Sequence, residues 1–123
     1  MKEIKHIFEP NPLACGQAVI AMITDTDVSE IIKLVGTNRE TTLAAMKALL
    51  SHFGFSLSFE RKEVVKISDL PSLALLSLET PKCWHWSLYC EGKVYDPEYG
   101  VLSDFPVSNR KYFWEVIKNR ERL

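Results

Sequence analysis

The chain has 123 residues, of which 46% are hydrophobic and 25% charged, and its formal net charge is −1 at pH 7. This length and composition predict one globular domain over residues 1–123 and exclude a disordered chain. Because 15 basic side chains nearly balance 16 acidic ones, charge gives no reason to expect a nucleic-acid or membrane-surface partner.

The N-terminal segment and the cysteines bear on where the protein works. Residues 1–10 carry charge throughout, and the longest apolar run is too short to span a bilayer, so we expect neither a signal peptide nor membrane insertion. Cys15, Cys83 and Cys90 are odd in number and lack metal-ligand spacing, which predicts no disulfide framework, no metal and no cofactor. A reducing cytoplasm is the simplest location, with export by another route left open.

Hydrophobic periodicity predicts three helices in the first half of the chain. The first covers residues 14–24, after the Asn-Pro pair at positions 11–12 closes an N-terminal arm. A second begins after Asp27, which stands in capping-box spacing with Glu30, and ends at Gly36. A third starts near residues 41–42 and ends at Gly54.

The apolar period then changes to two, which is typical of strands. The alternation of Phe55, Leu57 and Phe59 predicts a half-buried strand, and residues 72–79 are apolar enough for a central one. Segment 111–120 is a last element whose type the pattern leaves undecided. Together these elements predict an α+β fold with N-terminal helices packed on one side of an antiparallel β-sheet.

Aromatic and histidine side chains outside these patterns are assigned structural places. We expect the core to take the large aromatic residues near the strands, since no basic groove accompanies them as nucleic-acid stacking would require: Trp84, Trp86, Phe113 and Trp114. His6 and His52 are expected at the surface or at a helix end.

Cys15 stands at the expected start of the first helix, in the stretch NPLACGQAVIAMI. A helix N-terminus presents unpaired backbone N–H groups and the positive end of the helix dipole, which favour a nucleophilic thiolate. Gly16 is expected to leave space beside the sulfur for a substrate carbonyl, and the N–H of Cys15 to face a developing oxyanion. A buried cysteine that only packs in the core is the alternative.

The predicted hairpin, strands 85–90 and 93–96, supplies a possible partner for this thiol. A two-residue loop pairs Cys90 with Lys93 and brings Ser87 opposite Asp96. His85 and Asp96 then lie on one face as diagonal neighbours, where a carboxylate can hold an imidazole in one tautomer. A loop of different length would separate them and leave a helical interaction protein without a site. A core histidine and a turn aspartate are the alternatives.

The order and spacing of these motifs resemble the papain-like fold, most closely the bacteriocin-processing, double-glycine-type cysteine peptidases and their free-standing relatives. The resemblance covers about residues 9 to 105 and is carried by ACGQAVIAMI, VSEIIKLVGT, TTLAAMKALLSHFGF, ISDLPSLALL, HWSLYCEGKVYDPEYG and LSDF. It implies Cys15 as nucleophile, His85 as general base and acid, and Asp96 as orienting carboxylate. The family's processors are attached to a membrane transporter that brings the leader peptide. This chain ends at Leu123 without one, so the resemblance does not imply a double-glycine leader.

Glu9 departs from the family pattern, which places a glutamine six residues before the cysteine as an oxyanion donor. An ionised carboxylate only accepts hydrogen bonds. The amide of Asn11 is the first candidate to replace that donor, and the amide of Gln17, inside the helix, is a poorer one. Loss of one oxyanion donor costs a hydrolase about 10²–10³ in rate.

These residues predict a cysteine hydrolase that cleaves a peptide or other amide bond of a peptide or protein substrate through Cys15, His85, Asp96 and a thioacyl-enzyme. The alternative, which Glu9 favours, is a weak or inactive module of the same fold that binds a peptide or protein partner. An open cleft with the sulfur beside an imidazole nitrogen favours the enzyme. A cleft filled by tryptophan or by the N-terminal arm favours the module.

Overall fold

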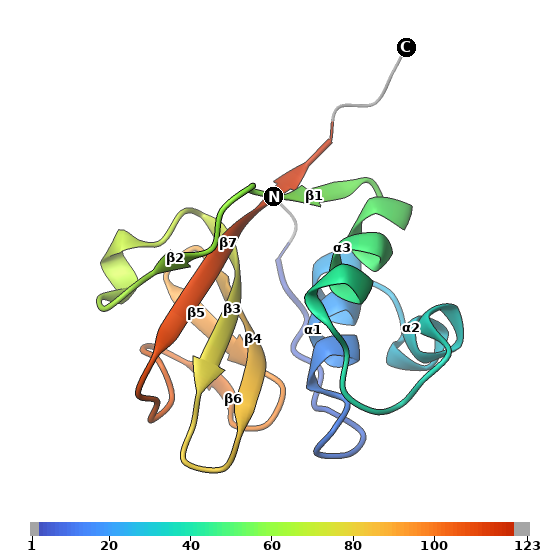
Figure 1. Ribbon diagram of the computed structural model, residues 1–123, viewed down its shortest axis with the longest axis horizontal. Coiled ribbons are helices and arrows are strands. Elements are labelled where there is room, and N and C mark those ends of the chain that lie inside the picture. The colour runs from blue at the N-terminus through green and yellow to red at the C-terminus, as the bar shows by residue number, and fades with distance from the viewer. Residues whose placement is uncertain (1–2, 120–123) are drawn as a thin grey trace.

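A computed structural model describes residues 3–119 and shows helices beside an antiparallel sheet (Figure 1). The helices are α1 (Cys15–Thr24), α2 (Val28–Val35) and α3 (Leu43–His52), with one 3-10 turn, η1 (Ile67–Asp69). The strands are β1 (Phe55–Leu57), β2 (Lys62–Glu63), β3 (Leu73–Glu79), β4 (Trp84–Cys90), β5 (Lys93–Asp96), β6 (Gly100–Leu102) and β7 (Lys111–Lys118). The α+β fold expected from the sequence is confirmed.

The helices lie where the sequence predicts them, with one difference in capping. The side chain of Asp27 makes no hydrogen bond to the start of α2, so the capping box expected with Glu30 does not form. Gly36 ends α2 in the left-handed conformation, with φ of 79°. Thr42 caps α3, and its hydroxyl oxygen accepts a hydrogen bond from the N–H of Ala45.

The sheet runs in the order β1-β7-β3-β4-β5-β6, and β2 pairs with β7. Segment 111–120, whose type the sequence left undecided, is therefore a strand between β1 and β3 as far as Lys118, and residue 120 lies outside the described residues. The strand predicted to reach Phe59 is wrong at its end. The chain bends after Ser58, whose N–H donates to the carbonyl oxygen of Glu115, and Phe59 is left 95% exposed.

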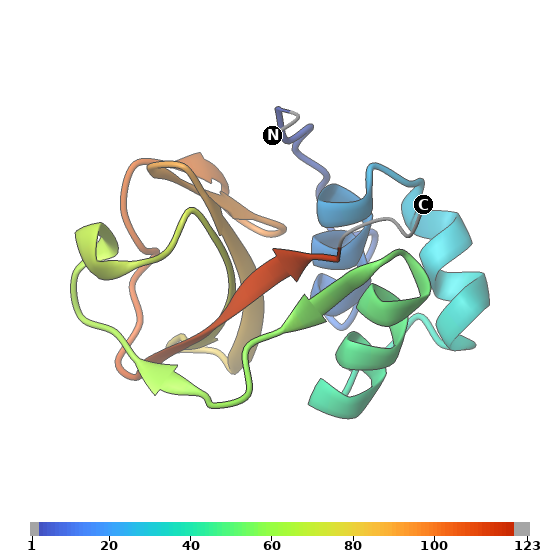
Figure 2. The same cartoon turned by 90° about the horizontal axis from the view of Figure 1, so that it is seen from above.

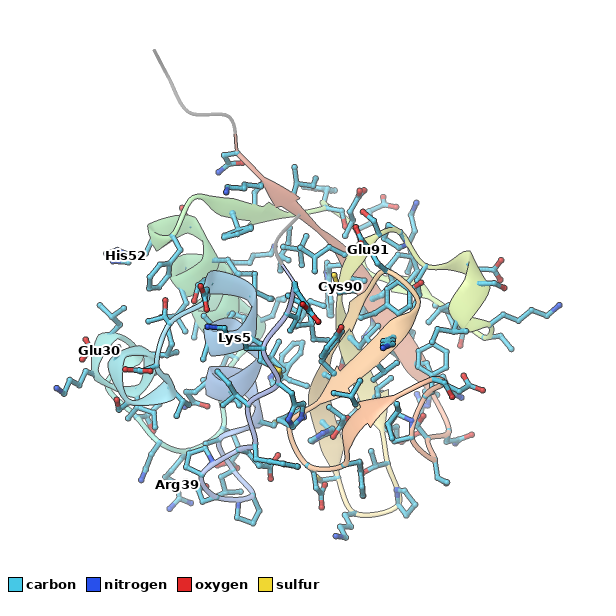
Figure 3. The ribbon with its side chains drawn as sticks, turned by 180° about the vertical axis from the view of Figure 1, so that it is seen from behind. Lys5, Glu30, Arg39, His52, Cys90 and Glu91 are labelled. Carbon is cyan, nitrogen blue, oxygen red and sulfur yellow. The ribbon has the colours of Figure 1, made fainter. Side chains whose placement is uncertain are left out.

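The sheet is curled (Figure 2). Each of its two faces carries a core of buried apolar side chains. The helix-facing core includes Leu88 and Cys90 of β4, whereas Tyr89 lies in the core of the other face. Because side chains alternate along a strand, Cys90 projects away from the face that carries His85. Figure 3 shows Cys90 in the interior, with Glu91 at the turn next to it.

The aromatic side chains are only partly where they were expected. Trp114 is buried in the helix-facing core and Trp86 packs against it half-buried. Trp84 is 48% exposed and stacks on Tyr112 with ring centroids 6.0 Å apart, so its assignment to the core is wrong. Trp84 is the first residue of β4 and lies at an end of the strand.

The β4–β5 hairpin has the register that the sequence predicts, with Cys90 paired to Lys93. Both loop residues have positive φ, 44° at Glu91 and 94° at Gly92. Turns of this mirror-image class match the twist of the two flanking strands. This register keeps the side chain of Asp96 on the same face of the sheet as His85 and Ser87 of β4.

Gly16 lies where the loop between α2 and α3 crosses helix α1. A Cβ atom at Gly16 would overlap the Oγ1 atom of Thr41 and lie 3.0 Å from Sδ of Met46 and 3.1 Å from Cδ1 of Trp86. The indole N–H of Trp86 donates to the carbonyl oxygen of Thr41 at 3.1 Å. The expectation that Gly16 leaves space for a substrate is therefore wrong, because Thr41 occupies that space.

We expect Gly16→Ala to lower the free energy of unfolding by about 1–3 kcal/mol, because overpacking forces a well-packed interior apart. Alanine is otherwise a better helix former than glycine. The sign of the change in unfolding free energy therefore shows whether overpacking or helix propensity dominates. The measurement is urea unfolding followed by circular dichroism. Ser29→Ala, at an exposed position in the first turn of α2, is the control and should change stability by less than about 0.5 kcal/mol. A stabilised Gly16→Ala protein would contradict this account.

Candidate active site

Asp96 ends strand β5 and is fully buried, yet both of its carboxylate oxygens have donors. Oδ1 accepts hydrogen bonds from the backbone N–H groups of Glu98 and Tyr99, at 2.8 and 3.0 Å. Oδ2 accepts one from the hydroxyl of Ser87 at 2.8 Å. Nε2 of His85 lies 3.0 Å from Oδ1 and 3.1 Å from Oδ2. A buried carboxylate requires this kind of satisfaction.

These donors keep Asp96 ionised despite its burial. Burial by itself raises the pKa of Asp96, but the hydrogen bond and charge of His85 outweigh it, together with the backbone N–H groups of Tyr99 and Glu98. The pKa of Asp96 therefore lies below its usual value. An ionised Asp96 fixes the imidazole with a proton on Nε2 and leaves Nδ1 for another partner.

Cys15 is that other partner of His85. The cysteine begins α1, the histidine is the second residue of β4, and α1 packs on β4. Burial lowers the pKa of His85, but side-chain hydrogen bonds with Asp96 and with Cys15 outweigh burial and raise it to about 10. The imidazole is therefore protonated at neutral pH. Sulfur, imidazolium and carboxylate stand in one chain of contacts.

A pocket of about 390 Å³ opens beside Cys15 and His85. The two side chains are only 8% and 4% exposed, so the pocket is the space in which a bound molecule could meet them. Its other lining residues come from the start of α1, the α2–α3 loop and the two central strands: Pro12, Leu13, Glu40, Thr41, Ser77, Cys83, Trp84 and Trp86. The tryptophans border this pocket and do not fill it.

Glu9 adds a carboxyl group close to His85. Its Oε1 atom is buried and has no hydrogen-bond partner among residues 3–119. Burial raises the pKa of Glu9 to about 7, with the charge of His85 opposing the shift and the charges of Glu98 and Asp96 adding to it. Near neutral pH a large fraction of Glu9 is therefore the neutral acid, which carries an O–H donor. The raised pKa departs from the fully ionised carboxylate that the sequence led us to expect.

The two amides that the sequence offered as oxyanion donors instead hold the loop between α2 and α3. Gln17 is fully buried, and its Nε2 donates to the carbonyl oxygens of Thr37 and Arg39 at 2.9 and 2.8 Å. Both amide protons of Gln17 are therefore used. Nδ2 of Asn11 donates to the carbonyl oxygen of Asn38 at 3.1 Å, which turns this amide toward the same loop.

Sequence reasoning missed two residues that position Asp96. Ser87 donates to its carboxylate, and the hairpin register that places Ser87 opposite Asp96 was the available signal. His6 was expected at the surface, but its Nε2 donates to the backbone oxygen of Asp96 at 2.7 Å. The two residues are 90 positions apart, so no local pattern could have indicated this contact.

Residues 3–119 form neither a metal-binding cluster nor a membrane-spanning helix. This part of the chain contains no cluster of three or more His, Cys, Asp or Glu side chains arranged to hold a metal ion. It also contains no helix with the length and apolar character needed to cross a membrane.

Comparison with known proteins places the chain beside two peptidase domains, although no family model and no curated sequence matches it. The peptidase domain of Streptococcus ComA, a bi-functional ABC transporter involved in a quorum-sensing pathway, has a TM-score of 0.65 and 15% identity, covering 95% of this chain and 100% of that one. A double glycine motif protease from an AMS/PCAT transporter, in complex with its leader peptide, has a TM-score of 0.68 and 12% identity, covering 95% and 93%. The protein shares the fold of these two peptidase domains, the papain-like fold that the sequence resemblance predicted.

We expect Asp96→Ala to lower the free energy of unfolding by about 3–5 kcal/mol, because it leaves a buried imidazolium without its partner. The matched control is Glu98→Ala, two residues later, which removes a carboxylate that pairs with exposed Lys82 at 3.0 Å. An ion pair of that kind contributes about 0–1 kcal/mol. Urea unfolding of the two variants measures the difference, and equal losses would contradict a central role for Asp96.

The raised pKa of His85 has a consequence for stability against pH. Since protonation is favoured by folding, the stability from His85 is complete below its ordinary pKa of 6.5 and is lost as pH rises toward about 10. We expect the difference in unfolding free energy between the wild type and His85→Gln to shrink across this interval. Urea unfolding at a series of pH values measures it, and parallel curves for the two proteins would argue against the raised pKa.

Proposed function

We propose that the protein is a cysteine hydrolase that cleaves a peptide or other amide bond. Cys15 is the nucleophile, His85 the general acid and base, and Asp96 the orienting carboxylate. The observation that carries the proposal is the chain of contacts from Asp96 through His85 to Cys15 beside an open pocket. A fold shared with two peptidase domains supports the same class of reaction.

The proposed reaction begins from a thiolate and an imidazolium. The Cys15 sulfur attacks the carbonyl carbon, a C–S bond forms, and the carbonyl π electrons move onto oxygen as an oxyanion. As the tetrahedral intermediate collapses, the C–N bond breaks and Nδ1 of His85 gives its proton to the leaving amine. Water then attacks the thioester and gives a proton to His85. The C–S bond breaks, the acid is released and the thiolate returns.

Helix α1 contributes the backbone part of the oxyanion site in this proposal. Cys15 is the first residue of the helix, so its N–H has no intrahelical acceptor and lies at the positive end of the helix dipole. A donor held in this way is fixed before the charge develops, which is the condition for effective oxyanion stabilisation.

A peptide is the substrate class that the comparisons favour. The double glycine motif protease of the same fold is described in complex with a leader peptide. The pocket beside Cys15 is open to the surface and has Leu13, Trp84 and Trp86 in its walls, which suits an extended chain with small or apolar side chains at the reacting bond.

A peptide-binding module without catalysis is the second candidate, and one observation favours it. The amides of Asn11 and Gln17 are engaged with the α2–α3 loop, which leaves Glu9 as the polar side chain expected at the oxyanion position. In its ionised form that carboxylate would repel an oxyanion.

We expect the wild-type protein to be acylated at Cys15 by p-nitrophenyl acetate with a burst of p-nitrophenol, and Cys15→Ala to lose both. Cys83→Ala is the matched control, because Cys83 is an exposed cysteine at the edge of the same pocket, and it should keep the burst. Mass spectrometry of the digested protein locates the acyl group, and circular dichroism checks the fold. Equal labelling of Cys83 or Cys90 in the Cys15→Ala protein would favour the binding module.

A further inference from the structure

The backbone around Glu9 lies between the end of β5, which carries Asp96, and the start of α1, which carries Cys15. His6 Nε2 donates to the Asp96 carbonyl at 2.7 Å, and the N–H of Glu9 donates to the carbonyl oxygen of Pro97 at 2.8 Å. The arm thus runs along the end of β5, in the seam between α1 and the sheet (Figures 1 and 3). It then turns through Asn11, whose carbonyl oxygen accepts from Ala14 N–H, directly into α1.

The side chain of Glu9 ends in an oxygen that is buried and unsatisfied. Native proteins rarely leave such an atom without a partner, because burial removes its water and costs about 1–3 kcal/mol. Among residues 3–119 only one other buried side-chain oxygen shares this state, Oε1 of Gln17, and that amide already donates twice. The carboxyl group of Glu9 instead interacts with His85, a residue that lines the pocket containing Cys15.

Charged groups from four elements face this carboxyl group. His85 on β4 and Lys82 in the β3–β4 turn favour its ionised form. Asp96 on β5 and Glu98 in the β5–β6 turn favour its neutral form, as does burial, the largest influence. The balance puts the pKa of Glu9 at about 7, so the carboxyl group changes from a hydrogen-bond donor to an anion across the neutral range.

We propose that the protonated carboxyl group of Glu9 is a catalytic residue that donates its O–H to the oxyanion formed when Cys15 attacks the substrate carbonyl. The proposal rests on the function proposed above. The proton stays on Glu9 throughout, so its O–H bond does not break. The hydrogen bond ends when the tetrahedral intermediate collapses to the thioester. Once Glu9 ionises, it loses the donor and adds a negative charge beside the oxyanion.

This role predicts a distinctive pH profile for acylation. The acylation rate of the wild type should fall as pH rises through neutrality, since fewer molecules carry the protonated Glu9. Glu9→Gln supplies a donor at every pH and should abolish this fall. Glu9→Ala supplies none and should acylate about 10²–10³ times more slowly than the wild type at pH 6.

The experiment measures pre-steady-state acylation by p-nitrophenyl acetate from pH 5.5 to 9 for the wild type, Glu9→Gln and Glu9→Ala. Alkylation by iodoacetamide is measured in parallel, because displacement of iodide forms no oxyanion and reports the thiolate alone. Glu98→Gln is made as a third variant, alone and in combination with Glu9→Gln. It removes a charge that raises the pKa of Glu9, so the pKa should drop and the fall in acylation rate should move to lower pH. In the Glu9→Gln protein the same substitution should leave the pH profile unchanged, because no carboxyl group titrates at position 9.

The outcomes separate the two proposals. A flattened profile in Glu9→Gln, slow acylation in Glu9→Ala and similar alkylation in all three proteins support the role of Glu9. If all three are acylated with the same rate and pH profile, or if Glu9→Gln is as slow as Glu9→Ala, the role of Glu9 is overturned and the hydrolase proposal stands. If Cys15 is alkylated but never acylated, the hydrolase proposal fails and the role of Glu9 fails with it.

Discussion

The buried carboxylate of Asp96 is the interaction on which the rest of the site depends. Its side chain holds His85 and Ser87 from β4 and two backbone N–H groups of the following turn, and its carbonyl oxygen holds His6 of the N-terminal arm. One residue thus joins a strand, a turn and an arm that are far apart in sequence. The same contacts orient the imidazole and hold the arm, with Glu9, close to His85.

The protons of the site are ordered by these contacts. Donors keep Asp96 ionised, the anionic partner then holds a proton on His85, and burial among carboxylates keeps a proton on part of the Glu9 population. Neighbouring groups whose pKa values are driven apart in this way can act as acid and base at the same pH. In this molecule the carboxylate that is best supplied with donors, Asp96, is the anion, whereas Glu9, whose Oε1 has no donor among residues 3–119, is partly protonated near neutral pH.

Local sequence patterns determined the helices, the hairpin and the pairing of His85 with Asp96. Helical periodicity placed Cys15 at the start of α1, because the spacing of apolar residues marks the buried face and the Asn-Pro pair ends the arm before it. The two-residue loop at 91–92 set the register of β4 and β5, since side chains alternate strictly along strands. Patterns of this kind depend on neighbours within a few residues, and the sequence contains them in full.

The tertiary structure alone decided how distant segments meet. It placed β7 between β1 and β3, left Trp84 exposed, filled the space at Gly16 with Thr41, and engaged the amides of Asn11 and Gln17 with the α2–α3 loop. It also brought Glu9 beside His85, across 76 positions of the chain. Residue type and spacing determine which chemical groups the chain contains and which close neighbours can pair. Hydrogen-bond partners and charge states also depend on burial and on distant neighbours, which only the folded chain supplies.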